Sequence, residues 1–142
     1  MNSKFFKARH KARRYALQAL YGWLMSGNDL RSIEDYSLQD KNHDKVDVEY
    51  FRGLLYNIPA NIEKLDAIIT PYLSRTINEI DPIELTILRM ATYELQYNIE
   101  VPYKVIINEA LELTKSFGAT DSHKFVNGIL DKLAKALRGA EF

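Results

Sequence analysis

The chain has 142 residues, of which 46% are hydrophobic and 27% are charged, and it contains no cysteine. This length allows one compact domain with a buried core, and the absence of cysteine excludes a disulfide framework, a thiolate nucleophile and cysteine-bound zinc. The longest apolar run, residues 19–25, is far below the roughly 18 residues that cross a bilayer. We therefore expect a cytoplasmic protein.

The net charge of zero conceals a strong asymmetry along the chain. Six of the 19 basic residues precede position 15 and no acid accompanies them, so the rest of the chain carries a net charge of −6. A basic segment attached to an acidic body is typical of proteins that bind polyanions. We call residues 1–14 the basic arm, and we expect its residues before about Arg9 to be disordered until they bind.

The N-terminal part of the sequence predicts helices. Apolar residues at spacings of three and four predict a first helix that continues from the basic arm to about residue 26: Ala12, Tyr15, Ala16, Ala19, Leu20, Trp23 and Leu24. A short helix is predicted at about 30–38, followed by a polar loop at 39–44. Residues 48–72 keep a helical phase across Pro59, which predicts one long helix, kinked at Pro59 and weakened or ended by Pro71.

Three further helices are predicted in the C-terminal part. The first begins at Asp81, with Pro82 at its first position and Glu84 closing a capping box, and its apolar residues on all sides predict a central helix. The second opens at Pro102 and ends at Gly118, which we expect in the left-handed conformation. The third begins with Asp121 or Ser122 as its cap and ends near Gly139.

The predicted fold class is therefore all-α: a single compact domain of about seven helices. It comprises an N-terminal helical half, about residues 1–73, and a C-terminal helical half, about 74–142.

Metal, cofactor and catalytic motifs are not found. His10, His43 and His123 share no spacing that places several ligands on one helix face. The polar loop resembles a calcium loop at its first ligands, but Lys45 stands where the turn requires glycine and Phe51 where the closing glutamate belongs. The six glycines form no phosphate-binding loop. We expect no metal, no cofactor and no enzymatic activity.

The basic arm continues into a one-sided polar stripe on the first helix. With 100° per residue and Arg14 at zero, Lys7 falls at about 20°, Lys11 at about 60°, Gln18 at about 40° and Tyr21 at about −20°. The apolar residues centre near 200°, so this stripe is predicted to point away from the core. Cations, an amide and an aromatic ring suit single-stranded RNA. The alternative is a solvated helix end with Tyr21 shielding a neighbouring side chain.

Several segments resemble the NusB family of bacterial transcription antitermination factors. The likeness runs in order from about Arg9 to Leu137, and the Pro-Tyr-Lys segment at 102–104 and the Phe-Val-Asn-Gly segment at 125–128 are its most specific parts. The other matching segments are 16–21, 50–51, 71–73, 89–95, 105–110 and 115–118.

The resemblance implies two helical subdomains that bind the boxA element of ribosomal RNA leader transcripts. It implies pairing with the small-subunit ribosomal protein NusE within an antitermination complex on RNA polymerase. The residues that it implies for RNA binding are Lys7, Arg9, Lys11, Arg13, Arg14, Gln18, Tyr21, Tyr72, Asp121, Lys124 and Phe125. Glu84, with Tyr21 nearby, is implied to contact NusE. This basic arm departs from the family in its higher lysine content and its added Phe5 and Phe6.

Each implied role has a structural alternative. Glu84 could serve only the capping box, and Asp121 could be only a helix cap. Phe125 could be a ring at the edge of the core, and Tyr72 could close the long third helix.

Two other functions compete with this one. NusB-like domains also precede the catalytic domain of some ribosomal RNA cytosine methyltransferases, but such an enzyme needs a nucleotide-binding sheet and a nucleophilic cysteine, and the 142 residues contain no cysteine, so we expect no such activity. A protein-binding helical adaptor, or a homodimer when free, is the other alternative.

Overall fold

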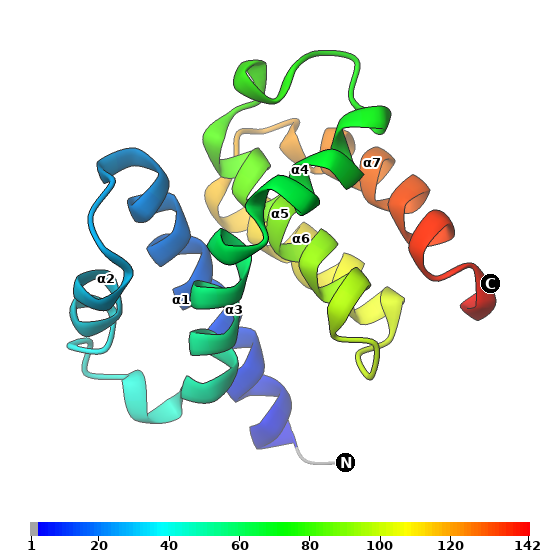
Figure 1. Cartoon of the computed structure of the whole chain (residues 1–142). Coiled ribbons are helices and arrows are strands. Elements are labelled where there is room, and N and C mark those ends of the chain that lie inside the picture. Colours follow the sequence, from blue (N-terminus) through cyan, green and yellow to red (C-terminus); the bar gives the residue numbers. More distant parts are fainter. Residues whose placement is uncertain (1–2) are drawn as a thin grey trace. The chain divides into compact units, whose positions relative to one another are not determined.

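The computed structural model describes residues 3–142, which contain seven α-helices and no strand (Figure 1). This confirms the predicted all-α class. The chain forms two compact units, one up to Ala60 and one over Asn61–Phe142, so the division falls earlier than the predicted position near residue 73.

The first unit consists of α1 (Ser3–Ser26), α2 (Leu30–Ser37), a 3-10 turn (His43–Lys45) and α3 (Val48–Ala60). Helix α1 packs against both α2 and α3. Its core combines small residues of α1 with large ones of α3, so the two helices approach closely; the buried residues include Ala12, Ala16, Leu17, Leu20, Phe51, Leu54, Leu55 and Ile58.

The second unit is built around one central helix. Its elements are α4 (Ile62–Ile69), 3-10 turns at Thr70–Tyr72, Ile77–Glu79 and Gly139–Glu141, α5 (Pro82–Tyr97), α6 (Tyr103–Phe117) and α7 (Ser122–Leu137). Every residue of α5 from Leu85 to Leu95 is buried, and α4, α6 and α7 all pack against this helix. The predicted central position of α5 is thereby confirmed.

The long helix predicted across Pro59 is wrong, because the structure has two helices there. Pro59 lies inside α3, which ends one residue later, and α4 begins after Asn61. Proline lacks the N–H of a regular helical hydrogen bond and its ring crowds the preceding turn. Helix α4 belongs to the second unit, where Arg89 of α5 donates two hydrogen bonds of 2.8 Å to the Asp66 carboxylate.

The expected left-handed conformation of Gly118 is also wrong. Gly118 ends α6 with φ −89° and ψ 175°, which any residue can adopt. Glycine is required here because of space: a Cβ atom would lie 2.9 Å from both Ser122 Cβ and the Thr114 carbonyl oxygen. The left-handed glycine is Gly27, with φ 72°, immediately after α1.

Candidate functional site

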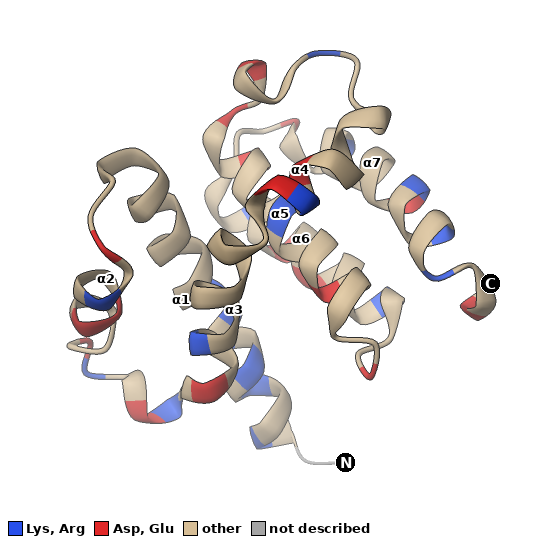
Figure 2. Ribbon diagram, viewed as in Figure 1, with Lys and Arg blue, Asp and Glu red and all other residues tan. Residues whose placement is uncertain are grey.

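The polar stripe predicted on α1 lies on a continuous helix. Helix α1 begins at Ser3, so the basic arm is helical from that residue on and does not match the expected disorder. Lys7 and Gln18 are exposed, whereas Lys11, Arg14 and Tyr21 are half-buried. We call these five residues the basic stripe, and Figure 2 shows the cations gathered on the N-terminal part of α1.

Arg9 does not lie on the basic stripe but packs between two aromatic rings. Its guanidinium carbon lies 4.5 Å from the ring centroid of Phe5 and 4.1 Å from that of Tyr50. Its Nε is 3.7 Å from the Asp47 carboxylate, and the Asp47 N–H donates to the Ala8 carbonyl at 3.0 Å. These contacts hold the N-terminal turns of α1 against the start of α3.

Arg13 is buried, with its guanidinium against the Tyr50 side chain. Its exposure is 3%, its Nη2 donates to the Tyr50 hydroxyl at 3.5 Å, and its guanidinium carbon lies 5.2 Å from the Tyr50 ring centroid. On the same 100° count, Arg9 falls at about 220° and Arg13 at about 260°. Both positions lie near the apolar face, so the helical phase already separates these arginines from the basic stripe.

The second unit contains the remaining predicted RNA residues. Tyr72 is half-buried in the 3-10 turn that packs against α7, the helix that carries Lys124 and Phe125. Lys124 is exposed and Phe125 half-buried, and the guanidinium carbon of Arg75 lies 5.1 Å from the Phe125 ring centroid. Arg75 carries no periodic sequence signal, because it lies in the segment between Pro71 and Asp81, outside the predicted helices.

Asp121 and Glu84 come together at the start of α7. Asp121 is exposed at the N-cap position but makes no capping hydrogen bond with its side chain. The adjacent Ser122 hydroxyl donates to Glu84 Oε2 at 2.6 Å. Glu84 is half-buried in the first turn of α5, so the structure brings a predicted NusE contact beside a predicted RNA contact.

The capping box predicted for Glu84 is wrong, although the predicted start of α5 is confirmed. Asp81 caps the helix by accepting from the N–H groups of Ile83 at 2.9 Å and Glu84 at 3.1 Å, and Pro82 follows it. The Glu84 carboxylate instead turns to Ser122. Ser122 lies 38 positions further along the chain, so local spacing could not reveal this partner.

No helix within residues 3–142 is long and apolar enough to cross a membrane. Over the same residues, no three histidine, aspartate or glutamate side chains gather in a way that could hold a metal ion.

Comparison with known proteins places the chain in one family. The sequence model of the NusB family matches residues 10–135. The chain is 50% identical to the transcription antitermination protein NusB of Legionella pneumophila (strain Corby) over 141 residues, which cover 99% of this chain and 96% of that protein. It is 54% identical to the NusB protein of Shewanella piezotolerans over 125 residues, which cover 88% of this chain and 93% of that protein.

Solved structures agree with the sequence comparison. A T. maritima NusB structure matches with a TM-score of 0.81 and 36% identity, over 89% of this chain and 90% of that one. A chain in the crystal structure of the antitermination factors NusB and NusE in complex with dsRNA matches with a TM-score of 0.79 and 28% identity, over 89% of this chain and 96% of that one. The chain belongs to the NusB family.

Proposed function

We propose that this protein is a transcription antitermination factor that binds boxA-type single-stranded RNA of ribosomal RNA leader transcripts. It binds this RNA together with the ribosomal protein NusE, as part of an RNA polymerase antitermination complex. Relatives about 50% identical over nearly the whole chain are transcription antitermination proteins. A structural relative belongs to a complex of NusB and NusE with RNA. Since transcripts are made in the bacterial cytoplasm, we place the protein there.

The basic stripe is the observation that carries the RNA-binding proposal. Lys7, Lys11 and Arg14 supply positive charge for phosphates, while Gln18 and Tyr21 add an amide and a ring that can contact an unpaired base. Because they lie on one helix, binding does not require them to be ordered first. These are binding groups, so the proposed role is binding without catalysis.

Arg9 and Arg13 have a supporting role in this proposal. Their contacts with Tyr50 hold α1 against α3 and thereby fix the direction of the basic stripe. They strengthen RNA binding by positioning other cations more than by touching phosphate themselves.

In the second unit, we propose Tyr72, Asp121, Lys124 and Phe125 as further RNA contacts. Lys124 supplies an exposed cation, and the Phe125 ring with Arg75 beside it offers a surface on which a base can stack. Glu84 is the proposed NusE contact. Its Oε2 is bonded to Ser122, and a carboxylate accepts up to about four hydrogen bonds, so it retains capacity for a partner.

The test is a fluorescence titration of boxA-type RNA with the full-length protein, in the presence and absence of NusE. The variant replaces Lys7, Lys11 and Arg14 by Gln, and a matched control replaces the exposed Lys64, Lys104 and Lys132 by Gln, with the same change in charge. We expect the stripe variant to lose affinity for the RNA. The slope of its log affinity against log salt should become shallower by about 2, because each of the three lost phosphate contacts contributes ~0.7. The control should stay close to wild type.

Equal affinities of the stripe variant and the control would contradict the proposed RNA site. Equally tight binding of the wild-type protein to an unrelated single-stranded RNA or to duplex RNA would contradict boxA selectivity. Binding of NusE without any binding of RNA would favour the protein adaptor instead.

A further inference from the structure

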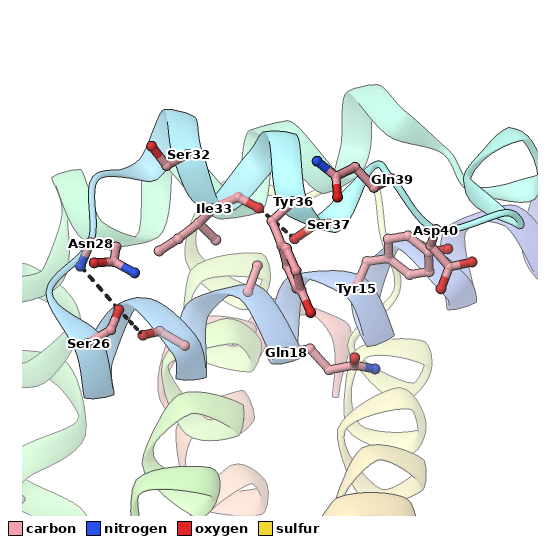
Figure 3. A pocket seen from close by; sticks show the side chains of 12 residues that line it. Tyr15, Gln18, Ser26, Asn28, Ser32, Ile33, Tyr36, Ser37, Gln39 and Asp40 are labelled. Carbon is pink, nitrogen blue, oxygen red and sulfur yellow. Dashed lines mark hydrogen bonds between the residues drawn. The ribbon is translucent and has the colours of Figure 1, made fainter.

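A cavity opens between α1 and α2 of the first unit. It has a volume of about 760 Å³, which lies in the range typical of small-molecule sites. One wall comes from α1 and the other from α2 and the loop that follows it. Figure 3 shows Tyr36 extending from α2 across the opening towards Gln18 of α1, with Tyr15 and Asp40 at one end.

The cavity combines one exposed ring with several hydrogen-bonding side chains. Tyr36 is 78% exposed, so its ring is open to a ligand. Gln18 and Gln39 contribute amides and Asp40 contributes a carboxylate. An unpaired nucleobase is recognised by an aromatic ring on which it stacks and by side chains that hydrogen-bond with its polar edge. This cavity offers both.

Asp40 and Tyr15 form the polar end of this cavity. The Asn42 N–H donates to Asp40 Oδ1 at 2.8 Å, which fixes the carboxylate but leaves it able to accept further hydrogen bonds. The Tyr15 hydroxyl is buried and lies near Asp40. Burial raises the pKa of Tyr15 and its interaction with Asp40 raises it further, so Tyr15 remains a neutral donor. This end of the cavity is therefore polar, with a carboxylate that can accept from a ligand.

The cavity borders the basic stripe directly. Counted from Arg14 at zero, Lys11 falls at about 60° and Gln18 at about 40°, while the cavity residues Gly22 and Tyr15 fall at about 80° and 100°. Gln18 belongs to both surfaces. An RNA backbone that follows the cations of the stripe therefore passes beside the opening and can turn a base into it.

We propose that this cavity is a nucleobase pocket: one base of the RNA bound to the basic stripe stacks on Tyr36 and donates from an exocyclic amino group to Asp40. The proposal rests on the proposed RNA-binding function and deepens it. Adenine, cytosine and guanine carry such an amino group, whereas uracil does not. The pocket therefore discriminates against uracil at a single position of the bound strand.

The experiment scans a boxA-type RNA with single abasic substitutions and single uridine replacements. Affinities are measured by fluorescence titration for the full-length wild type, Tyr36→Ala and Asp40→Asn. For the wild type, we expect one position at which base removal weakens binding about five- to hundredfold, the range for loss of one base stack. Uridine at that position should weaken binding as well. Tyr36→Ala should abolish the effect of base removal there, and Asp40→Asn should abolish the discrimination against uridine.

Two control variants match these changes outside the pocket. Asp35→Asn removes the same charge from an exposed position of α2, and Tyr97→Ala removes a ring that is 40% exposed in the second unit. Both should reproduce the wild-type scan. Because Tyr36 is so exposed, its truncation should leave the fold intact, which circular dichroism can verify.

The outcomes separate this proposal from the function on which it rests. If the wild type binds boxA-type RNA and the pocket variants give the same scan, the nucleobase pocket is wrong and the RNA-binding function stands. If Tyr36→Ala or Asp40→Asn weakens binding of NusE but leaves the RNA scan unchanged, the cavity holds a protein side chain and the proposal is overturned. If the wild type binds no RNA, both proposals fail.

Discussion

The Ser122 hydroxyl donates a hydrogen bond of 2.6 Å to the Glu84 carboxylate and thereby joins the first turn of α7 to the first turn of α5. The same oxygen accepts from the Ala119 N–H at 3.1 Å, so it also fixes the turn between α6 and α7. Ser122 is 3% exposed. One buried hydroxyl therefore positions both Asp121 and Glu84, the residues proposed to meet RNA and NusE.

Replacement of Ser122 by Ala should destabilise the protein by about 1–3 kcal/mol, because it leaves the Glu84 carboxylate and the Ala119 N–H without this partner. Urea denaturation followed by circular dichroism measures the change. The exposed Ser74→Ala is the control and should fall within about 0.5 kcal/mol of wild type. A Ser122→Ala protein as stable as Ser74→Ala would show that the hydroxyl contributes little.

Two glycine substitutions test why Gly118 is glycine. Gly118→Ala should destabilise by about 1–3 kcal/mol, because its Cβ would lie 2.9 Å from Ser122 Cβ and from the Thr114 carbonyl oxygen. Gly128→Ala, inside α7 with open space around the added Cβ, should stabilise by up to about 1 kcal/mol. Thermal unfolding of both variants measures these changes in stability. A Gly118→Ala protein more stable than wild type would exclude the steric explanation.

The elements whose signals are local were predictable from the sequence. Asp81 and Pro82 give the start of α5, and the continuous apolar content of that helix gives its central position. The break after Pro59 was not predictable from phase, because the apolar residues on both sides keep one helical register while proline interrupts the hydrogen bonds. Helix α4 joins the second unit through the ion pair of Asp66 with Arg89, which no local pattern contains.

The candidate site shows the same limit. Periodicity separates the basic stripe from the core, and it also puts Arg9 and Arg13 on the inner side once their angles are counted. Composition alone predicts that all of these cations lie on the surface, because charged side chains are usually exposed. The pair of Glu84 with Ser122 and that of Arg75 with Phe125 join residues far apart in the chain, so they emerge only from the packed structure.

Arg13 and Lys11 should differ in what their substitution disturbs. Arg13→Gln removes buried contacts with Tyr50 and should lower the free energy of unfolding by about 1–3 kcal/mol, while the salt dependence of RNA binding keeps its slope. Lys11→Gln should leave stability unchanged and make that slope shallower by ~0.7. Urea denaturation and salt titrations of both variants provide the comparison. The reverse pattern would place Arg13 on the RNA.

Arg138 closes the C-terminal end of α5. Its side chain is 5% exposed, and it donates to four backbone carbonyls at 2.7–3.2 Å: those of Glu94, Leu95, Asn98 and Val101. A helix end leaves such carbonyls without partners inside the helix.

Arg138→Ala should therefore destabilise the protein by about 3–5 kcal/mol. Arg138→Lys should recover only part of this loss, because an ammonium group lacks the planar fork. Lys135→Ala, at an exposed position near the end of α7, should have little effect in the same urea titration. Full recovery by lysine would show that charge alone matters at this position.

Glu34 links the stability of the first unit to pH. It is buried in α2, and its Oε1 accepts from the Tyr56 hydroxyl at 2.6 Å, while Oε2 is paired with Arg52 of α3. The hydrogen bond from Tyr56, followed by that from Arg52, holds the pKa of Glu34 below its ordinary value of 4.5. A carboxyl whose pKa is lowered by folding stabilises the folded state above that ordinary value, and this contribution is lost as the pH falls through the lowered pKa.

Glu34→Gln should consequently be less stable than wild type at pH 7, and the difference should shrink as the pH falls below about 4.5. Urea denaturation of both proteins between neutral and acidic pH measures this. Tyr56→Phe removes the hydrogen bond that lowers the pKa of Glu34 most and keeps the ring, so its pH dependence should lie between those of wild type and Glu34→Gln. A difference that stays constant across this range would mean that the charge of Glu34 contributes nothing, and that its carboxyl joins α2 to α3 only as a neutral acceptor.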